Sequence, residues 1–251
     1  MGHNTHTQVK FIFFTPQKTF NMKKTIILLL FIACVSGRTA SAQTVSGEAP
    51  RFRIAVQGGY GYRLGKLRES GQDVIDQHNK KLKWGFVCGA DATWFTSNDF
   101  GFGLKFHNMR SSAEDAVTVT YADGSSKSGM YRDVVDLRFL GAIASTRSVT
   151  PSGKWIFIVD FGLGYLSMID NGRMIDPVSI KGGTLGYCVD AGVDFRLMNK
   201  LYLGLSVNTI CGTLSSYSLT NDGRTETVKL EKDEHETLYH LTASVGLRLY
   251  L

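Results

Sequence analysis

The sequence predicts an all-β protein, a single eight-stranded antiparallel up-and-down β-barrel that spans a membrane. Residues 239–251 alternate between apolar and polar side chains, and seven earlier segments do the same. The connections between these segments are short and long in turn. Successive strand side chains point to opposite faces, so each segment has one apolar and one polar face. With the apolar face repeated on every strand, the pattern indicates lipid outside and polar groups within.

Residues 1–42 are predicted to be an upstream extension followed by a cleaved signal peptide. Met22 is the expected start of translation. Lys23 and Lys24 precede an apolar stretch at 25–35, which is the order of charge and apolarity in a secretory signal. That stretch is shorter than the ~20 residues that a transmembrane helix needs.

Small residues at Ala40-Ser41-Ala42 form the expected cleavage site, with cleavage after Ala42. Residues 43–50 then form a short periplasmic linker, and residues 51–251 form the barrel domain. These features predict export through the general secretory route. Acylation at Cys34, which would make the protein a lipoprotein, stays open as an alternative.

The net charge of +6 comes mainly from the region before the barrel. Residues 1–42 contain five basic side chains and no acidic one, so 23 basic and 22 acidic residues remain after cleavage. A nucleic-acid partner inferred from the high pI is therefore excluded. The three remaining cysteines, Cys88, Cys188 and Cys211, lack the close spacing of a zinc site or a disulfide framework. No cofactor and no metal is expected.

Each segment is long enough for the ~9–11 residues that a tilted membrane strand needs. In the first, Ile54, Val56 and Tyr60 alternate with Arg53 and Gln57. The expected segments are 51–64, 84–96, 99–110, 133–147, 154–167, 184–198, 200–213 and 239–251.

The second and third segments set aromatic and aliphatic side chains against glycines, Asp91, Lys105 and His107. The fourth is expected to point Val135, Leu137, Phe139 and Ile143 outward, and Asp136, Arg138 and Leu140 inward. The fifth to seventh segments repeat the alternation, with these outward residues: Trp155, Phe157, Phe161, Leu163, Leu185, Tyr187, Val193, Phe195, Leu201, Leu203 and Leu205.

The connections at 97–99, 150–153 and 199–200 are short turns, and the other four are long polar loops. Outer-membrane barrels place short turns in the periplasm and long loops outside the cell. Three long loops are expected to extend as hairpins, with tips at Asp123-Gly124, Asn171-Gly172 and Asn221–Gly223. The remaining long loop is expected to contain a short helix at 73–76.

The C-terminus resembles the assembly signal of bacterial outer-membrane barrels. Ser244, Gly246, Leu249 and Leu251 occupy its specified places, although many members end on an aromatic residue. Over residues 51–251 the chain looks like the small outer-membrane β-barrel proteins, similar to the transmembrane domain of outer membrane protein A. The resemblance implies a Gram-negative outer-membrane location, and insertion by the outer-membrane assembly machinery. It implies no ligand, because fold does not fix function.

Charged and polar side chains that face inward are predicted to form a structural network of ion pairs that plugs the lumen. Eight strands leave an interior just wide enough for side chains to fill, and buried charges are tolerated only when paired. The expected members are Arg53, Asp91, Lys105, His107, Asp136, Arg138, Asp160, Asp190, Asp194, Arg196, His240 and Arg248.

The favoured function is that of a non-enzymatic surface protein, structural or binding an extracellular ligand through its loops, with outer-membrane lipids around it. A low-conductance, porin-like channel is the first alternative. The second is a lipid-modifying hydrolase using His107, which is expected near the outer end of its strand. The acidic run at 233–236 could also bind a divalent cation, although solvated loop acids are the simpler interpretation.

Overall fold

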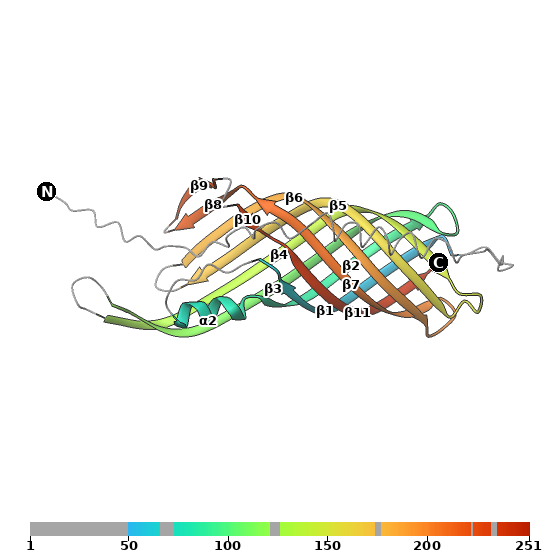
Figure 1. Ribbon diagram of the computed structural model, residues 1–251, viewed down its shortest axis with the longest axis horizontal. Coiled ribbons are helices and arrows are strands. Elements are labelled where there is room, and N and C mark those ends of the chain that lie inside the picture. Colours follow the sequence, from blue (N-terminus) through green and yellow to red (C-terminus); the bar gives the residue numbers. More distant parts are fainter. Residues whose placement is uncertain (1–49, 66–72, 121–125, 174–176, 222, 232–234) are drawn as a thin grey trace.

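Eight antiparallel strands close into a barrel, as the alternation predicted. The computed structural model describes residues 50–65, 73–120, 126–173, 177–221, 223–231 and 235–251. Each strand pairs with its neighbours, and the last strand pairs with the first to close the ring. Figure 1 shows the strands tilted around the long axis of the molecule. The barrel strands are β1 (Phe52–Arg63), β2 (Trp84–Phe95), β3 (Phe100–Thr120), β4 (Ser126–Val149), β5 (Trp155–Arg173), β6 (Pro177–Arg196), β7 (Leu201–Leu214) and β11 (His240–Tyr250).

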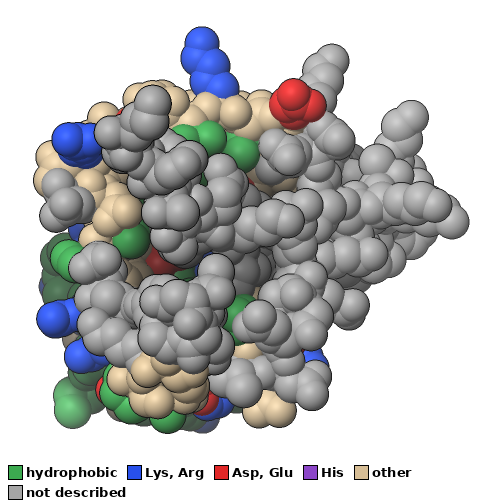
Figure 2. Space-filling view, turned by 90° about the vertical axis from the view of Figure 1, so that its left-hand side faces the viewer, with side chains coloured by type: hydrophobic (Ala, Val, Ile, Leu, Met, Phe, Trp, Pro, Cys, Tyr) green, Lys and Arg blue, Asp and Glu red, His purple; other side chains and the backbone are tan. Residues whose placement is uncertain are grey.

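The two ends of the barrel differ in length and content. At the short-turn end, compact turns join β2 to β3, β4 to β5 and β6 to β7. At the long-loop end, on the left of Figure 1, several strands run far beyond the barrel wall. Additional elements lie there: α2 (Asp73–Lys81), β8 (Ser216–Asn221), β9 (Arg224–Lys229) and β10 (Glu236–Thr237). Figure 2 looks onto this end, where Lys and Arg side chains stand out around the rim.

The long-loop hairpins are longer than the sequence suggested. Pairing of β3 with β4 continues to Thr120 and Ser126, and the expected tip at 123–124 lies outside the described residues. Asn171-Gly172 was wrongly predicted as a tip, because Asn171 pairs with Ser179 inside the β5–β6 ladder. Asn221 does pair with Arg224 across the turn between β8 and β9, where Gly223 has a φ of 74°.

The outer surface carries a continuous apolar belt, defined by the exposed apolar side chains of the eight barrel strands. A belt of this kind suits hydrocarbon rather than water. Among the described residues, no helix is both long and apolar enough to cross a membrane. The belt includes Phe52, Ile54, Tyr60, Trp84, Phe86, Trp94, Phe102, Leu104, Phe106, Leu140, Trp155, Phe157, Phe161, Leu163, Tyr165, Leu185, Leu203, Leu205, Leu241, Val245 and Leu247.

Strand β4 faces the opposite way from the prediction. Leu137 and Phe139 are buried inside the barrel, together with Val135 and Ile143. Leu140 is 61% exposed and belongs to the belt instead. The reason is that the lumen next to this part of β4 is apolar, so the alternation of apolar residues does not distinguish inside from outside here.

The barrel interior has two differently filled regions. Toward the long-loop end an apolar cluster fills it, and toward the short-turn end a charged network fills it. The apolar cluster includes Val87, Met109, Leu137, Phe139, Ile143, Leu166, Met168, Ile210, Leu214 and Leu238. Ile156, Ile158, Tyr202 and Tyr250 form a second, small apolar group toward the short-turn end.

Candidate functional site

The charged network is organised around Asp194 on β6. Its Oδ1 lies 3.3 Å from Nε of Arg248, and its Oδ2 lies 3.6 Å from Nε of Arg53. The hydroxyl of Tyr250 donates a hydrogen bond of 2.6 Å to the same Oδ2. One carboxylate therefore lies between two guanidinium groups that belong to the first and the last strand of the barrel.

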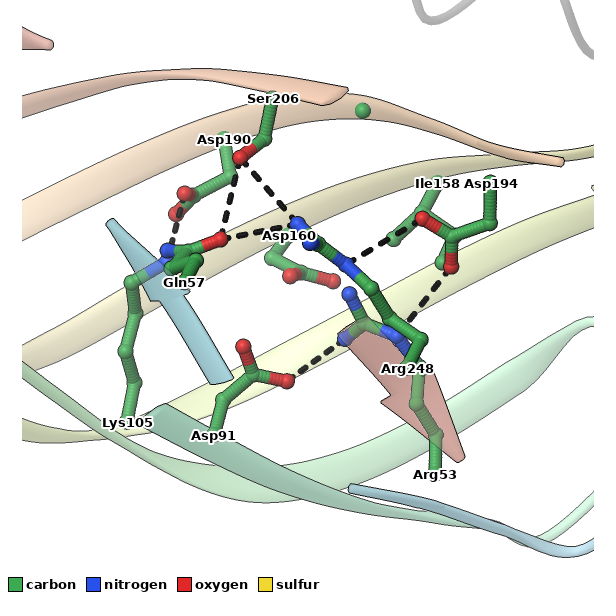
Figure 3. A pocket seen from close by; sticks show the side chains of 11 residues that line it. Arg53, Gln57, Asp91, Lys105, Ile158, Asp160, Asp190, Asp194, Ser206 and Arg248 are labelled. Carbon is green, nitrogen blue, oxygen red and sulfur yellow. Dashed lines mark hydrogen bonds and ion pairs between the residues drawn. The ribbon is translucent and has the colours of Figure 1, made fainter. Parts of the chain in front are cut away.

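Two further carboxylates balance the remaining charge (Figure 3). Arg53 Nη1 donates a 2.6 Å hydrogen bond to Asp91 Oδ1, and Lys105 Nζ donates a 2.5 Å bond to Asp190 Oδ1. All four side chains are at most 6% exposed. Buried charges of this kind are tolerable because each has a partner of opposite sign at hydrogen-bond distance.

Gln57 and Ser206 complete the network, and neither was among the predicted members. Gln57 Oε1 accepts hydrogen bonds from Arg248 Nη2 at 2.9 Å and from Ser206 Oγ at 3.1 Å. Both residues face inward in the alternation of their strands, which is the signal that identifies them. They hold the guanidinium of Arg248 from the side opposite Asp194.

The space left inside the network is very small. It forms a cavity of about 10 Å³, lined by charged and polar side chains including Asp160. A volume of this size has room for about one water molecule. The lumen is therefore occluded at this level by the side chains themselves.

The two predicted lumen histidines stack on each other, away from the carboxylates. The ring centroids of His107 and His240 lie 5.5 Å apart, and both side chains are fully buried. Nδ1 of His240 donates to the carbonyl oxygen of Leu238 at 3.0 Å. Neither ring nitrogen of His107 has a hydrogen-bond partner among the described residues. His107 is not near the outer end of its strand, because β3 continues to Thr120.

Three predicted members lie elsewhere. Asp136 and Arg138 were predicted to face the lumen, but the alternation of β4 places both on its outer face. The two side chains lie 3.8 Å apart there, Arg138 48% exposed and Asp136 8% exposed. Arg196 is exposed at the short-turn end, where its Nε donates to the hydroxyl of Tyr202 at 3.1 Å. Because the faces of β4 are exchanged relative to the prediction, Arg147 also points inward, and the sequence analysis missed it. Its guanidinium lies 3.7 Å from the centroid of the Phe95 ring.

A separate polar cluster lies at the long-loop end, where α2 packs against β3. Nδ1 of His78 lies 2.9 Å from Asp115 Oδ2, and its Nε2 lies 3.3 Å from Asp133 Oδ2. The imidazole also stacks on Tyr131 with centroids 4.2 Å apart. Lys81 Nζ donates to the other oxygen of Asp115 at 2.5 Å. The sequence indicated only a short helix at 73–76, so this cluster was missed.

Electrostatic effects in this cluster favour a protonated His78. Burial opposes the charge, but hydrogen bonds to Asp133 and Asp115 outweigh burial and raise the pKa of His78. The hydrogen bond from Lys81 lowers the pKa of Asp115. Nearby, burial and the charge of Asp133 raise the pKa of Asp170 to about 7.

The acidic run at 233–236 lies only partly within the described residues, and its last member is not a surface acid. Glu236 is buried, with Oε1 3.6 Å from Nη2 of Arg63. Within the described part of the chain, no group of three or more His, Cys, Asp or Glu side chains is arranged to hold a metal ion.

The C-terminal residues that resemble the assembly signal form the seam with β1. Ser244 pairs with Gly59 and Gly246 with Gln57. A Cβ atom at Gly246 would collide with the carbonyl oxygen of Val56, so only glycine fits there. Leu249 and Leu251 point outward and are exposed. Their part in assembly stays a prediction.

Comparison with known proteins supports the fold and identifies no function. No family model and no curated protein matches the sequence. A major outer membrane protein from Thermus thermophilus superposes with a TM-score of 0.52 at 12% identity, covering 81% of this chain and all of that one. Two other structures resemble this chain less. Neisserial surface protein A has 12% identity and a TM-score of 0.47, and the match covers 82% of this chain and all of that one. OprG from Pseudomonas aeruginosa has 9% identity and a TM-score of 0.46, and the match covers 83% of this chain and all of that one.

The closed ring of eight antiparallel strands agrees with the fold of the Thermus thermophilus protein. In barrels of this fold the short-turn end faces the periplasm and the long-loop end faces the outside of the cell. The chain has the fold of a small β-barrel of the bacterial outer-membrane type.

Proposed function

We propose that the protein is a closed, non-enzymatic outer-membrane barrel that stiffens the envelope and presents its extended hairpins to extracellular ligands. The occluded lumen is the observation that carries this proposal. A pore needs a continuous aqueous path, and the charged network leaves a cavity of only about 10 Å³. The apolar cluster above it is a second barrier, because water is excluded from tightly packed aliphatic and aromatic side chains.

The surface part of the proposal is supported by the hairpins beyond the belt. The β3–β4 ladder continues past the last exposed apolar residues of the wall, and β9 has a free edge where its backbone groups face away from β8. Free strand edges and long loops are the parts of a barrel that a partner protein or saccharide can reach.

Planar-bilayer recording with the purified, refolded protein tests the closed lumen. We expect no unit conductance above the noise at potentials at which a trimeric porin, added as a positive control, gives clear steps. Reproducible unit currents from this protein would contradict the closed-barrel function and support a channel instead.

A low-conductance channel is the second candidate, and one observation favours it. Several buried lumen atoms lack a hydrogen-bond partner among the described residues, including Asn208 Nδ2 and Oδ1, Thr242 Oγ1 and Ser244 Oγ. Buried polar atoms without a protein partner are usually satisfied by ordered water. Water at this level would hydrate part of the lumen, but it must still pass the charged network.

A hydrolase using His107 has less support. A general base needs a proton to abstract within about 2.6–3.2 Å and a substrate that can reach it. The His107 imidazole is fully buried, and the described residues place no carboxylate at hydrogen-bond distance from it.

A further inference from the structure

A groove of about 410 Å³ lies on the outer surface of the molecule, where β5 and β6 meet the β8–β9 hairpin. The four strands pair in the order β5, β6, β8, β9 and lie side by side at the upper left of Figure 1. The volume falls within the range of about 300–1,000 Å³ typical of small-molecule sites. The groove is distinct from the lumen.

The lower edge of the groove touches the membrane. Tyr165, 60% exposed, lines the groove and belongs to the apolar belt, beside Leu185, which is 76% exposed. Gly183 allows the Tyr165 ring to lie flat against β6, since a Cβ there would collide with the Tyr165 hydroxyl. From this edge the groove extends toward the long-loop end, so it reaches from hydrocarbon into the head-group layer of the outer leaflet.

The walls above this edge are rich in hydroxyl groups. Ser167 on β5 faces Ser216 and Ser218 on β8 and Thr227 on β9. Hydroxyl groups both donate and accept hydrogen bonds, so they match the hydroxyls of a saccharide. An acyl chain alone would leave them unsatisfied.

One cation lines the groove, and two arginines on the neighbouring strands share a single carboxylate, Asp136. Lys181 lines the groove and is exposed, and the described residues provide no ion-pair partner for it. Arg138 lies on β4, in register with Ser167 of the groove. Within the described part of the chain, Arg138 makes one ion pair, the 3.8 Å contact with Asp136. Arg110, exposed on the neighbouring strand, is in register with the same Asp136. Among Lys181, Arg138, Arg110 and Asp136, three side chains are cationic and one is anionic.

We propose that this groove binds the phosphorylated saccharide head group of an outer-leaflet glycolipid. Lys181 and Arg138 bind the phosphate, the hydroxyl-lined walls bind the sugar, and the acyl chains descend over Tyr165 and Leu185. Charge-assisted hydrogen bonds from cationic side chains to phosphate are among the stronger contacts available at a surface. The site functions whether or not the lumen conducts.

Native mass spectrometry of the protein in detergent micelles tests the proposal, with diphosphoryl lipid A as the probe. We expect one lipid A to be retained per protein. Dephosphorylated lipid A and phosphatidylglycerol should each be retained at least fivefold less at the same concentration. These two probes separate the need for phosphate from the need for a sugar.

Two variants localise the binding. Lys181→Glu reverses the charge, and Ser218→Trp fills the groove; each should reduce retention of lipid A at least fivefold. Lys154→Glu, at the exposed short-turn end, is the matched control and should bind like the wild type. Heat-dependent gel mobility checks that each variant is a folded barrel.

Unchanged retention by both folded variants would overturn the proposal, as would equal retention of phosphatidylglycerol, which would indicate unspecific annular lipid. Equal loss in Lys154→Glu would mean that net charge rather than the groove controls binding, and would overturn it too.

Discussion

The two halves of the lumen close the same barrel by different chemistry. Toward the short-turn end, Arg53, Arg248 and Asp194 fill the interior with charge, and each is at most 5% exposed. Toward the long-loop end, Leu137 and Phe139 fill it with hydrocarbon. The ionic half depends on having every partner present, whereas the apolar half depends only on shape and volume. A single substitution should therefore affect the two halves for different reasons.

The largest effect is expected from Asp194→Ala in the ionic half. It leaves Arg53, Arg248 and the Tyr250 hydroxyl without their shared acceptor. Loss of one partner of a buried ion pair costs about 3–5 kcal/mol. Urea unfolding of the barrel in detergent, followed by tryptophan fluorescence, measures the change.

Glu226→Ala, on the exposed face of β9, is the control and should change the free energy of unfolding by less than about 0.5 kcal/mol. If Asp194→Ala were equally mild, water would be solvating the two arginines, and the lumen would not be closed there.

A somewhat smaller effect is expected from Leu137→Ala in the apolar half. The side chain is 1% exposed inside the barrel, so its removal leaves a cavity and should cost about 2–5 kcal/mol. Leu140→Ala is a control on the same strand, because that side chain faces detergent and leaves no cavity. The same unfolding assay should rank Leu137→Ala above Leu140→Ala; the reverse order would mean that β4 faces as the sequence first suggested.

The smallest effect concerns the pH response of α2, outside the membrane. The raised pKa of His78 means that its stabilisation is complete below pH 6.5 and is lost as the pH rises through the raised value. Asp170 acts in the same direction. Its pKa is about 7 in the folded state and 3.8 in the unfolded state, so the folded protein loses stability as the pH rises from 3.8 to about 7. Around His78 lie these titratable or charged groups: Lys81, Asp115, Tyr131, Asp133 and Asp170.

Amide hydrogen exchange measures this response. After correction for intrinsic exchange, the amides of α2 should exchange faster at pH 9 than at pH 6, while those of β11 should not change. His78→Asn should remove most of the difference. Equal protection of α2 at both pH values in the wild type would show that the histidine does not hold the helix.

The fold was predictable because one physical rule governs every strand. In β1, Arg53 and Gln57 face in while Ile54 and Val56 face lipid, and the same alternation gave the strand number and the location of the short turns. Where both surroundings are apolar, the rule loses its information. This happened in β4, whose inward Leu137 and Phe139 and outward Leu140 are all hydrophobic.

The site was less predictable because its contacts connect distant strands. The alternation placed Lys105 and Asp190 inside, but only the closed ring shows that these residues, 85 positions apart, form a pair. The His78 cluster depends on a helix packed against a strand extension, and local sequence indicated only part of that helix. The groove depends on how the β8–β9 hairpin joins β6, which no periodicity encodes.

The seam between β1 and β11 has a consequence for biogenesis. Arg53 pairs across it with Tyr250, and Asp194 joins the arginines of both strands. A polypeptide that lacks β11 therefore cannot form a closed cylinder. Such a truncated chain would carry two unpaired sheet margins, which invite degradation or misassociation. Closure thus depends on the presence of this one strand.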